Sequence, residues 1–231
     1  MAGGGHGRDN DAHITGPNAW AQALAAVVLV GALSGGLWWL AQTSSEERSE
    51  PKPATCSEGE TPAAKGKHLS GAQLCQALNR SGLAALLGTP TEIAKTASGS
   101  DSSIGKIATP QAQVEFETYT VTLSATYDDL PVAGSEALLG RDAVRQKVLG
   151  RPGVLYSTRT ISISFRLDGG EADSGPGVPA RAVTVAQDAK DRGGSLDVTL
   201  WRADGVMPDD AVLLRVAQEV LPTVPGWKSG G

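Results

Sequence analysis

Two cysteines are the residues of this chain whose type and spacing point most clearly to chemistry. Cys56 and Cys75 are the only cysteines, and a disulfide between them would close a loop of about 20 residues. Such a loop adds roughly 3 kcal/mol of stability and forms in an oxidising compartment. Two free thiols or a two-cysteine metal site are the alternatives. We favour the disulfide because histidine, the usual further ligand of zinc, is scarce in this chain.

The scarcity of histidine also limits the enzymatic functions open to the chain. It has three histidines, and only His68 stands at the edge of the predicted domain. This excludes a Ser-His-Asp triad and most histidine-based metal sites there. No glycine-rich stretch fits a phosphate-binding loop, since Gly193 and Gly194 predict a hairpin turn. We therefore expect no enzyme, no catalytic, cofactor-binding or metal-binding residue, and no cofactor.

Three groupings of charged residues could form functional sites, and for each we favour an ordinary role in a turn or on a solvated surface. They are the calcium-type acids Asp168, Glu171 and Asp173, the carboxylate pair Asp128 and Asp129, and the cationic set Arg145, Lys147, Arg151 and Arg159. The first group lacks the full EF-hand spacing, and adjacent aspartates are common in turns. The net charge of −5 shows no basic excess, so we expect no nucleic-acid partner.

An uncharged apolar run near the amino terminus predicts where in the cell the rest of the chain lies. Ala19 to Ala41 contains 23 residues, and as a helix it rises about 35 Å, enough to cross a hydrocarbon core of about 30 Å. Trp20 lies near one end and Trp38 and Trp39 near the other, as in interfacial aromatic belts. We predict a transmembrane helix over 19–42 as an uncleaved signal anchor. A cleaved signal peptide and a buried core helix are the alternatives.

The orientation of this anchor rests on two features, because basic residues near its ends do not decide it. The preceding tail, 1–18, is short, and both cysteines follow the span. We expect a cell-membrane protein with a disordered cytoplasmic tail and an extracytoplasmic carboxy-terminal domain. Gly31 and Gly35 form a GxxxG stripe through which the span could form a homodimer, although we favour the simpler explanation that glycine is common in membrane helices.

After the span, composition predicts a flexible linker over 43–68 and an α+β domain over 69–228. Helices are predicted from Ser70, over 83–87, over 142–149 and from Pro208. Strands are predicted over 93–97, 113–127, 153–167, 181–186 and 196–202, with loops over 98–103 and 168–179. The apolar positions of 113–127 change parity, which predicts a bulge near Glu117 and Thr118. We expect an antiparallel sheet with helices packed mainly on one face.

Three stretches carry a resemblance to a known family. They are GPNAWAQALAAVVLVGALSGGLWWLA, LCQALNRSGLAALLGTP and RAVTVAQDAKDRGGSLDVTLWRADGVMPDDAVLLRVAQEVLPTVPGW. The chain resembles a family of uncharacterised single-pass membrane proteins of high-GC Gram-positive bacteria, a domain of unknown function that implies no activity. More distantly, the pattern from Cys75 to Gly88 is similar to small envelope lipoproteins of the PsbP/Mog1 type.

These observations favour a membrane-anchored extracytoplasmic domain that binds a protein partner or an envelope ligand. The bilayer itself is a partner through 19–42. One alternative is a carboxylate-based hydrolase acting on envelope carbohydrate, which would need two facing acids and aromatic platforms. Another is a structural subunit of a membrane complex. Aromatic residues make up only 4% of the chain, which disfavours the hydrolase.

Overall fold

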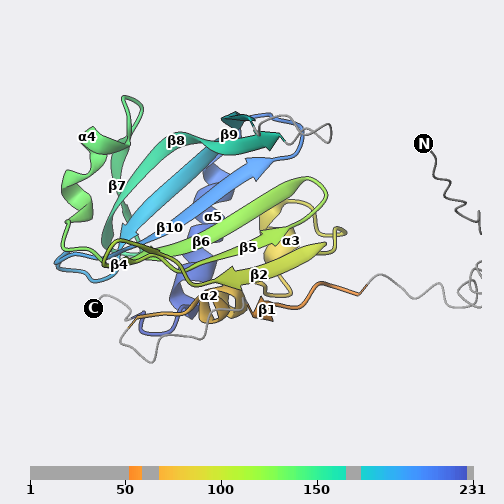
Figure 1. Cartoon of the computed structure of the whole chain (residues 1–231), viewed down its shortest axis with the longest axis horizontal. Coiled ribbons are helices and arrows are strands. Elements are labelled where there is room, and N and C mark those ends of the chain that lie inside the picture. The colour runs from red at the N-terminus through yellow and green to blue at the C-terminus, as the bar shows by residue number, and fades with distance from the viewer. Residues whose placement is uncertain (1–51, 59–67, 165–172, 228–231) are drawn as a thin grey trace, which may run out of the picture. The chain divides into compact units, whose positions relative to one another are not determined.

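One sheet of eight strands organises the fold, and its strand order is β1-β2-β5-β6-β10-β9-β8-β7 (Figure 1). The computed structural model describes residues 52–58, 68–164 and 173–227, all within the compact unit Pro51–Gly231. Strand β1 pairs parallel with β2, and every other pairing in the sheet is antiparallel. The prediction of an α+β fold built on an antiparallel sheet is confirmed.

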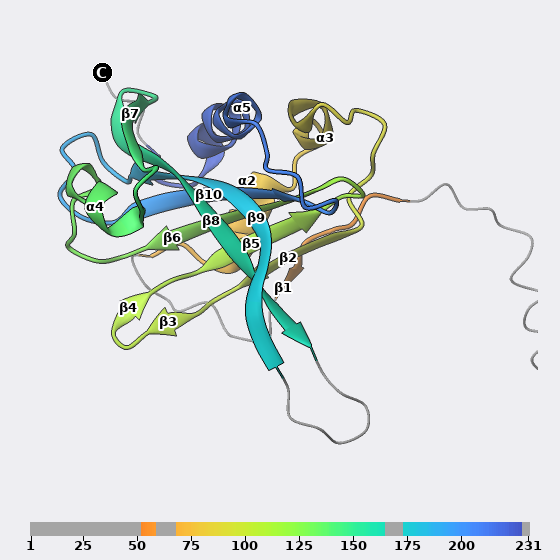
Figure 2. The same ribbon diagram turned by 90° about the horizontal axis from the view of Figure 1, so that it is seen from above.

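The strands differ greatly in length. Those of the large sheet are β1 (Ser57–Glu58), β2 (Thr96–Ser100), β5 (Gln111–Glu115), β6 (Tyr119–Thr126), β7 (Val144–Val148), β8 (Arg151–Ser164), β9 (Asp173–Ala186) and β10 (Ser195–Arg202). A separate hairpin consists of β3 (Ser103–Ile104) and β4 (Ile107–Ala108). The long strands β8 and β9 extend as a two-stranded ribbon beyond the rest of the sheet (Figure 2).

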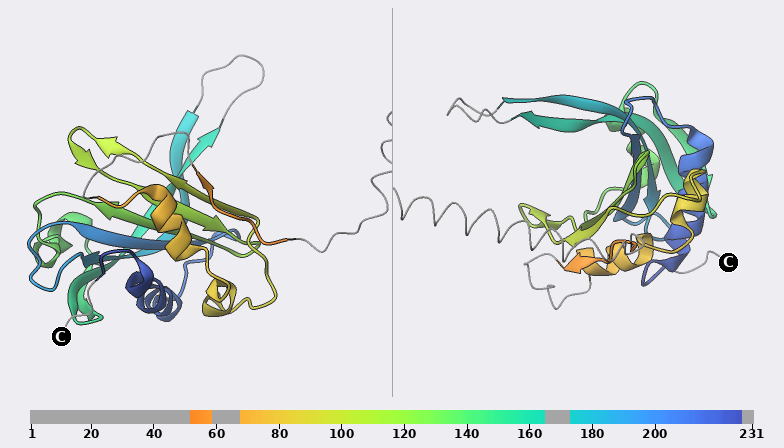
Figure 3. Two further views of the ribbon diagram at one scale, coloured as in Figure 1. Left: turned by 90° about the horizontal axis from the view of Figure 1, so that it is seen from below. Right: turned by 90° about the vertical axis from the view of Figure 1, so that its right-hand side faces the viewer.

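Helices α2 (Gly71–Leu78), α3 (Leu83–Leu87) and α5 (Asp210–Val220) cover one face of the sheet (Figure 2; Figure 3, left). Ser70 begins α2 as predicted, because its side chain accepts from the Gln73 amide while the Gln73 side chain accepts from Ser70 N, a capping box. Asp209 caps α5, whose apolar stripe is fully buried. The main core therefore lies between these helices and the alternate residues of β5, β6, β9 and β10 that face them.

Among the described residues, the opposite face of the sheet is covered only at one end. There η2 (Val132–Gly134) and α4 (Glu136–Leu139) pack near β8, and Val132, Val154 and Ala186 form a small second core. The remaining face lies inside the curve of the sheet, between the β8–β9 ribbon and the β3–β4 hairpin (Figure 3, right). Its residues are mostly polar, because each strand alternates apolar residues toward the helices with polar residues away from them.

The predicted single strand 113–127 is wrong, since two strands joined by a tight turn occupy it. β5 ends at Glu115 and β6 begins at Tyr119, and Phe116 N donates to Tyr119 O across the turn. The parity change is thus the corner of a hairpin, which lets Phe116 and Tyr119 both face the core. The predicted bulge at Glu117 and Thr118 is the turn itself.

The predicted helix over 142–149 is also wrong, because residues Val144–Val148 form β7 at the edge of the sheet. Val144 and Val148 have the four-residue spacing of a helix face, but only Val148 is buried. Leu149 and Gly150 have φ values of 52° and 80°, the signature of a two-residue hairpin turn. Gly150 therefore turns the chain into β8 instead of ending a helix.

Several predicted boundaries shift. The edge strand expected over 93–97 is β2, which takes in part of the expected loop 98–103, and β9 takes in 173–179 of the loop expected over 168–179. Within the predicted linker 43–68, Ala54 N donates to Ala94 O and Ser57 pairs with Ser98, so the folded part includes these residues.

The hairpin of 181–186 and 196–202 and the short helix 83–87 match their predictions. The last helix, predicted from Pro208, begins two residues later at Asp210, with Asp209 as its cap. The predicted tail 1–18 and transmembrane helix 19–42, with Gly31 and Gly35, lie outside the described residues. Within the described ranges, no helix is long and apolar enough to cross a bilayer.

Candidate binding site

A cavity of about 390 Å³ opens at one end of the helix-covered side of the sheet. Its wall combines the start of α2, the end of β6, the turn between β9 and β10, and the turn that follows α5. The side chains that give it character are His68, Gln73, Tyr127, Gln187 and Trp227. Segments far apart in sequence therefore meet here, and the volume falls within the range of about 300–1,000 Å³ typical of small-molecule sites.

Two aromatic rings form one part of the wall. The rings of His68 and Tyr127 stack with centroids 4.0 Å apart and planes inclined by 15°. The Tyr127 hydroxyl oxygen accepts from Leu69 N at 2.7 Å. A phenol that accepts one hydrogen bond still has its own proton to donate, so Tyr127 can offer that donor to a bound molecule.

The Trp227 ring is held from behind by a buried arginine. Arg151 is 1% exposed, and its guanidinium carbon lies 3.5 Å from the centroid of the Trp227 ring. Its Nη1 donates to the carbonyl oxygens of Ala186 and Gln187. Burial lowers the pKa of Arg151 from its ordinary value, yet a guanidinium stays charged at neutral pH. This cation–π contact fixes the tryptophan and ties it to the β9–β10 turn.

Two glutamine amides supply the polar part of the wall. The side-chain oxygen of Gln73 accepts from Ser70 N at 2.9 Å, which directs the carbonyl of the amide into the capping box. Its NH₂ group donates to no described residue, and the residue is exposed. Gln187 stands at the start of the turn, where its backbone N–H donates to Gly194 O. Its side-chain amide contains both a donor and an acceptor.

The described lining of the cavity lacks formally charged carboxylate, ammonium and guanidinium groups, and this limits the kind of ligand that fits. No Asp, Glu, Lys or Arg side chain is among the described residues that line the cavity. The guanidinium of Arg151 is stacked on Trp227, a lining residue, and bonded to backbone carbonyls. The arrangement therefore suits an uncharged polar molecule with a flat face.

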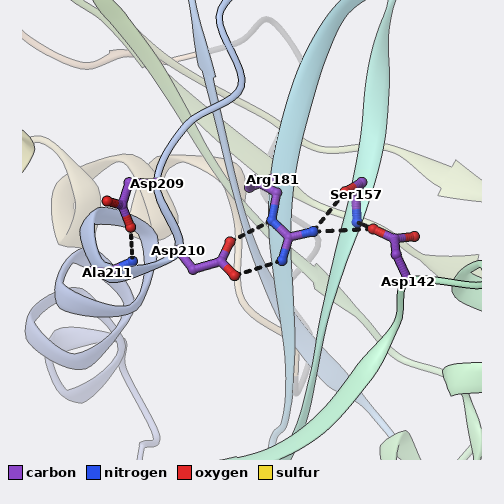
Figure 4. Close-up of polar contacts among 6 residues, drawn as sticks. All are labelled: Asp142, Ser157, Arg181, Asp209, Asp210 and Ala211. Carbon is purple, nitrogen blue, oxygen red and sulfur yellow. Dashed lines mark hydrogen bonds and ion pairs between the residues drawn. The ribbon is translucent and has the colours of Figure 1, made fainter.

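A second cluster, centred on Arg181, has a structural role (Figure 4). Arg181 Nε and Nη2 donate to the two carboxylate oxygens of Asp210 at 2.6 and 2.9 Å, and Nη1 donates to Ser157 Oγ at 2.7 Å and Asp142 Oδ2 at 3.2 Å. Asp210 is the first residue of α5, and Asp209 before it accepts from Ala211 N. The buried arginine thus fixes the amino terminus of α5 to β8 and β9.

The uncovered face of the sheet has its own polar network around Asp197. The carboxylate of Asp197 accepts from the hydroxyls of Tyr156, Thr184 and Thr199 at 2.8, 2.6 and 2.7 Å. Burial, followed by the Asp197 charge, raises the pKa of Tyr156 far above its ordinary value of 10.0. All four residues come from β8, β9 and β10, so the network links three strands across the face.

The structure brings together one of the sequence-predicted groups. Cys56 and Cys75 form the predicted disulfide, with their Cα atoms 5.9 Å apart, and the disulfide fastens the segment before β1 to α2.

The charged groups considered from sequence do not form sites of their own. Asp128 accepts from Leu130 N as a turn residue, as favoured from sequence. The cationic set is divided: Arg151 stacks on Trp227, while Arg159 donates to Gly177 O on the ribbon.

The calcium-type group cannot be placed, since Asp168 and Glu171 lie outside the described residues. Among the residues that the structure does describe, no three His, Cys, Asp or Glu side chains gather as a metal site. The cavity residues were missed from sequence because they come from four separate segments. The one available signal was the position of scarce residue types, His68 and Trp227, at the two ends of the predicted domain.

Fold and cavity together define a class: a disulfide-closed α+β domain with a small uncharged cavity at its edge. Residues 14–142, more than half of the chain, match the model of a family of unknown function (DUF6215), and the chain belongs to that family. No curated protein and no solved structure matches it. The expected resemblance to an uncharacterised family is confirmed at this level, while the single-pass and PsbP/Mog1 parts of it stay predictions.

Proposed function

We propose that this chain is a membrane-anchored extracytoplasmic domain that binds a ligand in the cavity lined by His68, Gln73, Tyr127, Gln187 and Trp227. The Cys56–Cys75 disulfide is the observation that carries the location. Disulfides persist in oxidising compartments and are rare where thiols are kept reduced. The apolar run over 19–42 supplies an anchor of the right length, and the short tail before it favours export of the domain after it.

The cavity supports binding more than catalysis or a purely structural role. Its aromatic and amide groups converge from four segments, while the hydrolase alternative needs two acids about 5–10 Å apart. On the uncovered face, Asp197 of β10 and Glu115 of β5 are separated by β6 and lie at opposite ends of the paired region. At about 3.3 Å per residue, four residues of offset alone separate them by about 13 Å. They therefore do not form such a pair.

The test measures the thiol state and the membrane association of the chain in the cells that produce it. Cells are quenched in acid, thiols are blocked with a maleimide before and after reduction, and membranes are separated from soluble protein. We expect the chain in the membrane fraction, with Cys56 and Cys75 modified only after reduction. A Cys56→Ser, Cys75→Ser double variant is the control for non-specific modification. Recovery in the soluble fraction, or modification of both thiols without reduction, would overturn the proposal.

A further inference from the structure

The chemistry of the cavity wall narrows the class of ligand, and this step rests on the proposed function. We infer that the cavity binds a neutral sugar ring. A pyranose has an apolar face of C–H groups, which packs on an aromatic ring, and a rim of hydroxyls that both donate and accept hydrogen bonds. The wall provides a tryptophan ring and planar amides, the complementary pair of features.

The ring that receives the sugar is Trp227. Arg151 covers one side of this indole at 3.5 Å, and its position is fixed by bonds to the Ala186 and Gln187 carbonyls. The indole is partly buried against the main core and also lines the cavity. A ring held in this way loses little conformational freedom when a ligand packs on it, so more of the contact energy appears as affinity.

The hydroxyl rim is matched by three polar groups that line the same cavity as the indole. Gln73 offers N–H donors because its oxygen is engaged by Ser70 N, and Tyr127 offers its hydroxyl proton because its oxygen is engaged by Leu69 N. Gln187 contributes both a donor and an acceptor. Donors of this kind satisfy sugar oxygens, and the amide oxygen of Gln187 satisfies a sugar hydroxyl proton.

The absence of charged side chains from the described lining favours neutral sugars over charged ones. The described lining has no carboxylate to attract an aminosugar cation and no Lys or Arg side chain to attract an acidic sugar. A charged sugar would lose hydration on entry without gaining an ion pair, a cost that a neutral sugar avoids. Neutral rings, including N-acetylated ones, are therefore favoured over amino or carboxylate sugars of the same shape.

The experiment uses the purified full-length chain in detergent micelles and saturation-transfer NMR with four probes. These are N-acetylglucosamine and glucose as neutral sugars, with glucosamine and glucuronate as charged sugars of the same ring size. We expect at least one neutral sugar to bind, and both charged sugars to bind more weakly. Binding of neither neutral sugar, or tighter binding of a charged one, overturns the inference.

Variants locate the binding. Gln187→Leu removes the amide at nearly constant size and is expected to weaken binding about tenfold, the effect of one lost hydrogen bond of about 1.4 kcal/mol. Trp227→Leu is expected to abolish it. Gln113→Leu makes the same chemical change on the uncovered face and is expected to leave affinity unchanged. Equal affinity of Gln187→Leu and the unaltered chain for the neutral sugar contradicts the assignment of the sugar to this cavity.

The thiol-modification and membrane-fractionation experiment tests the proposed location separately, because its result does not depend on sugar binding.

Discussion

Arg151 shows how a single buried charge can shape the candidate site. It is almost fully buried, stacks on Trp227 and donates to two backbone carbonyls at the end of β9. Arginine suits this position because its planar guanidinium can stack on an aromatic face and donate hydrogen bonds in its plane at once. The residue therefore acts through Trp227 and Gln187 and does not itself line the cavity.

Tyr156 predicts how stability changes at alkaline pH. Burial and the neighbouring Asp197 raise the pKa of its phenol, so in the folded chain it keeps its proton at a pH where the unfolded chain loses it. The free energy of unfolding should therefore fall as the pH rises above about 10. Urea unfolding at a series of pH values should show this fall.

The matched variant is Tyr156→Phe, which lacks the ionisable hydroxyl. It should show a shallower decline above pH 10, although it loses about 1 kcal/mol near neutral pH because Asp197 loses one donor. An identical alkaline slope in the two proteins would show that Tyr156 is not the group responsible.

Asp142 gives the corresponding prediction in acid. Hydrogen bonds from Ser157, together with the charge of Arg181, lower the pKa of this carboxyl below its ordinary value of 3.8. A lowered pKa contributes stability that is present above 3.8 and is lost as the pH falls toward the folded-state value. Asp142→Asn should therefore flatten the loss of stability below about pH 4, measured by thermal unfolding. Unchanged acid behaviour in this variant would exclude the contribution.

At the scale of elements, the contact between α2 and β2 depends on two glycines. A Cβ on Gly99 would lie 2.2 Å from Gly71 O, and a Cβ on Gly71 would lie 2.3 Å from Ser100 N. The helix backbone therefore rests directly on the strand backbone. The disulfide from Cys75 in α2 to Cys56 beside β1 strengthens the same contact.

Gly99→Ala should separate α2 from β2. We expect a loss of about 3 kcal/mol in the free energy of unfolding, because backbone atoms of α2 cannot move aside as a side chain could. Gly82→Ala is the control, since a Cβ there meets nothing within 4 Å, and it should change stability by less than about 0.5 kcal/mol. Equal effects of the two variants would argue against the close contact.

Elements with strong local signals were predictable from sequence, while those decided by a tight turn were not. Ser70 was predictable as the cap of its helix because side-chain caps act within a few residues, and the last helix was predictable from Pro208 and its apolar stripe. The turn at Glu117 and Thr118 and the strand β7 were mistaken because their patterns fit two structures locally. In both cases the chain forms a hairpin with the neighbouring strand, so the tight turn decides the structure, and the apolar spacing alone does not distinguish that turn from a bulge or a helix end.

At the scale of the whole molecule, the same distinction separates the disulfide from the cavity. Two cysteines alone in the chain have one possible intramolecular pairing, so that contact could be predicted. The cavity needs His68, Gln187 and Trp227 to meet from three segments, which only the complete sheet and its helices bring about. The proposals about location and anchoring therefore depend on the sequence and the disulfide, while the proposal about the ligand depends on the three-dimensional arrangement of the cavity.

The most direct test of the central claim is the accessibility of two introduced cysteines on intact cells. Ser103→Cys places a thiol on the exposed β3–β4 hairpin, and Ala2→Cys places one in the predicted cytoplasmic tail. Each is treated with a membrane-impermeant maleimide before and after lysis. We predict modification of the hairpin thiol on intact cells and of the tail thiol only after lysis. The reverse pattern, or protection of both positions until lysis, would contradict an extracytoplasmic domain on a membrane anchor.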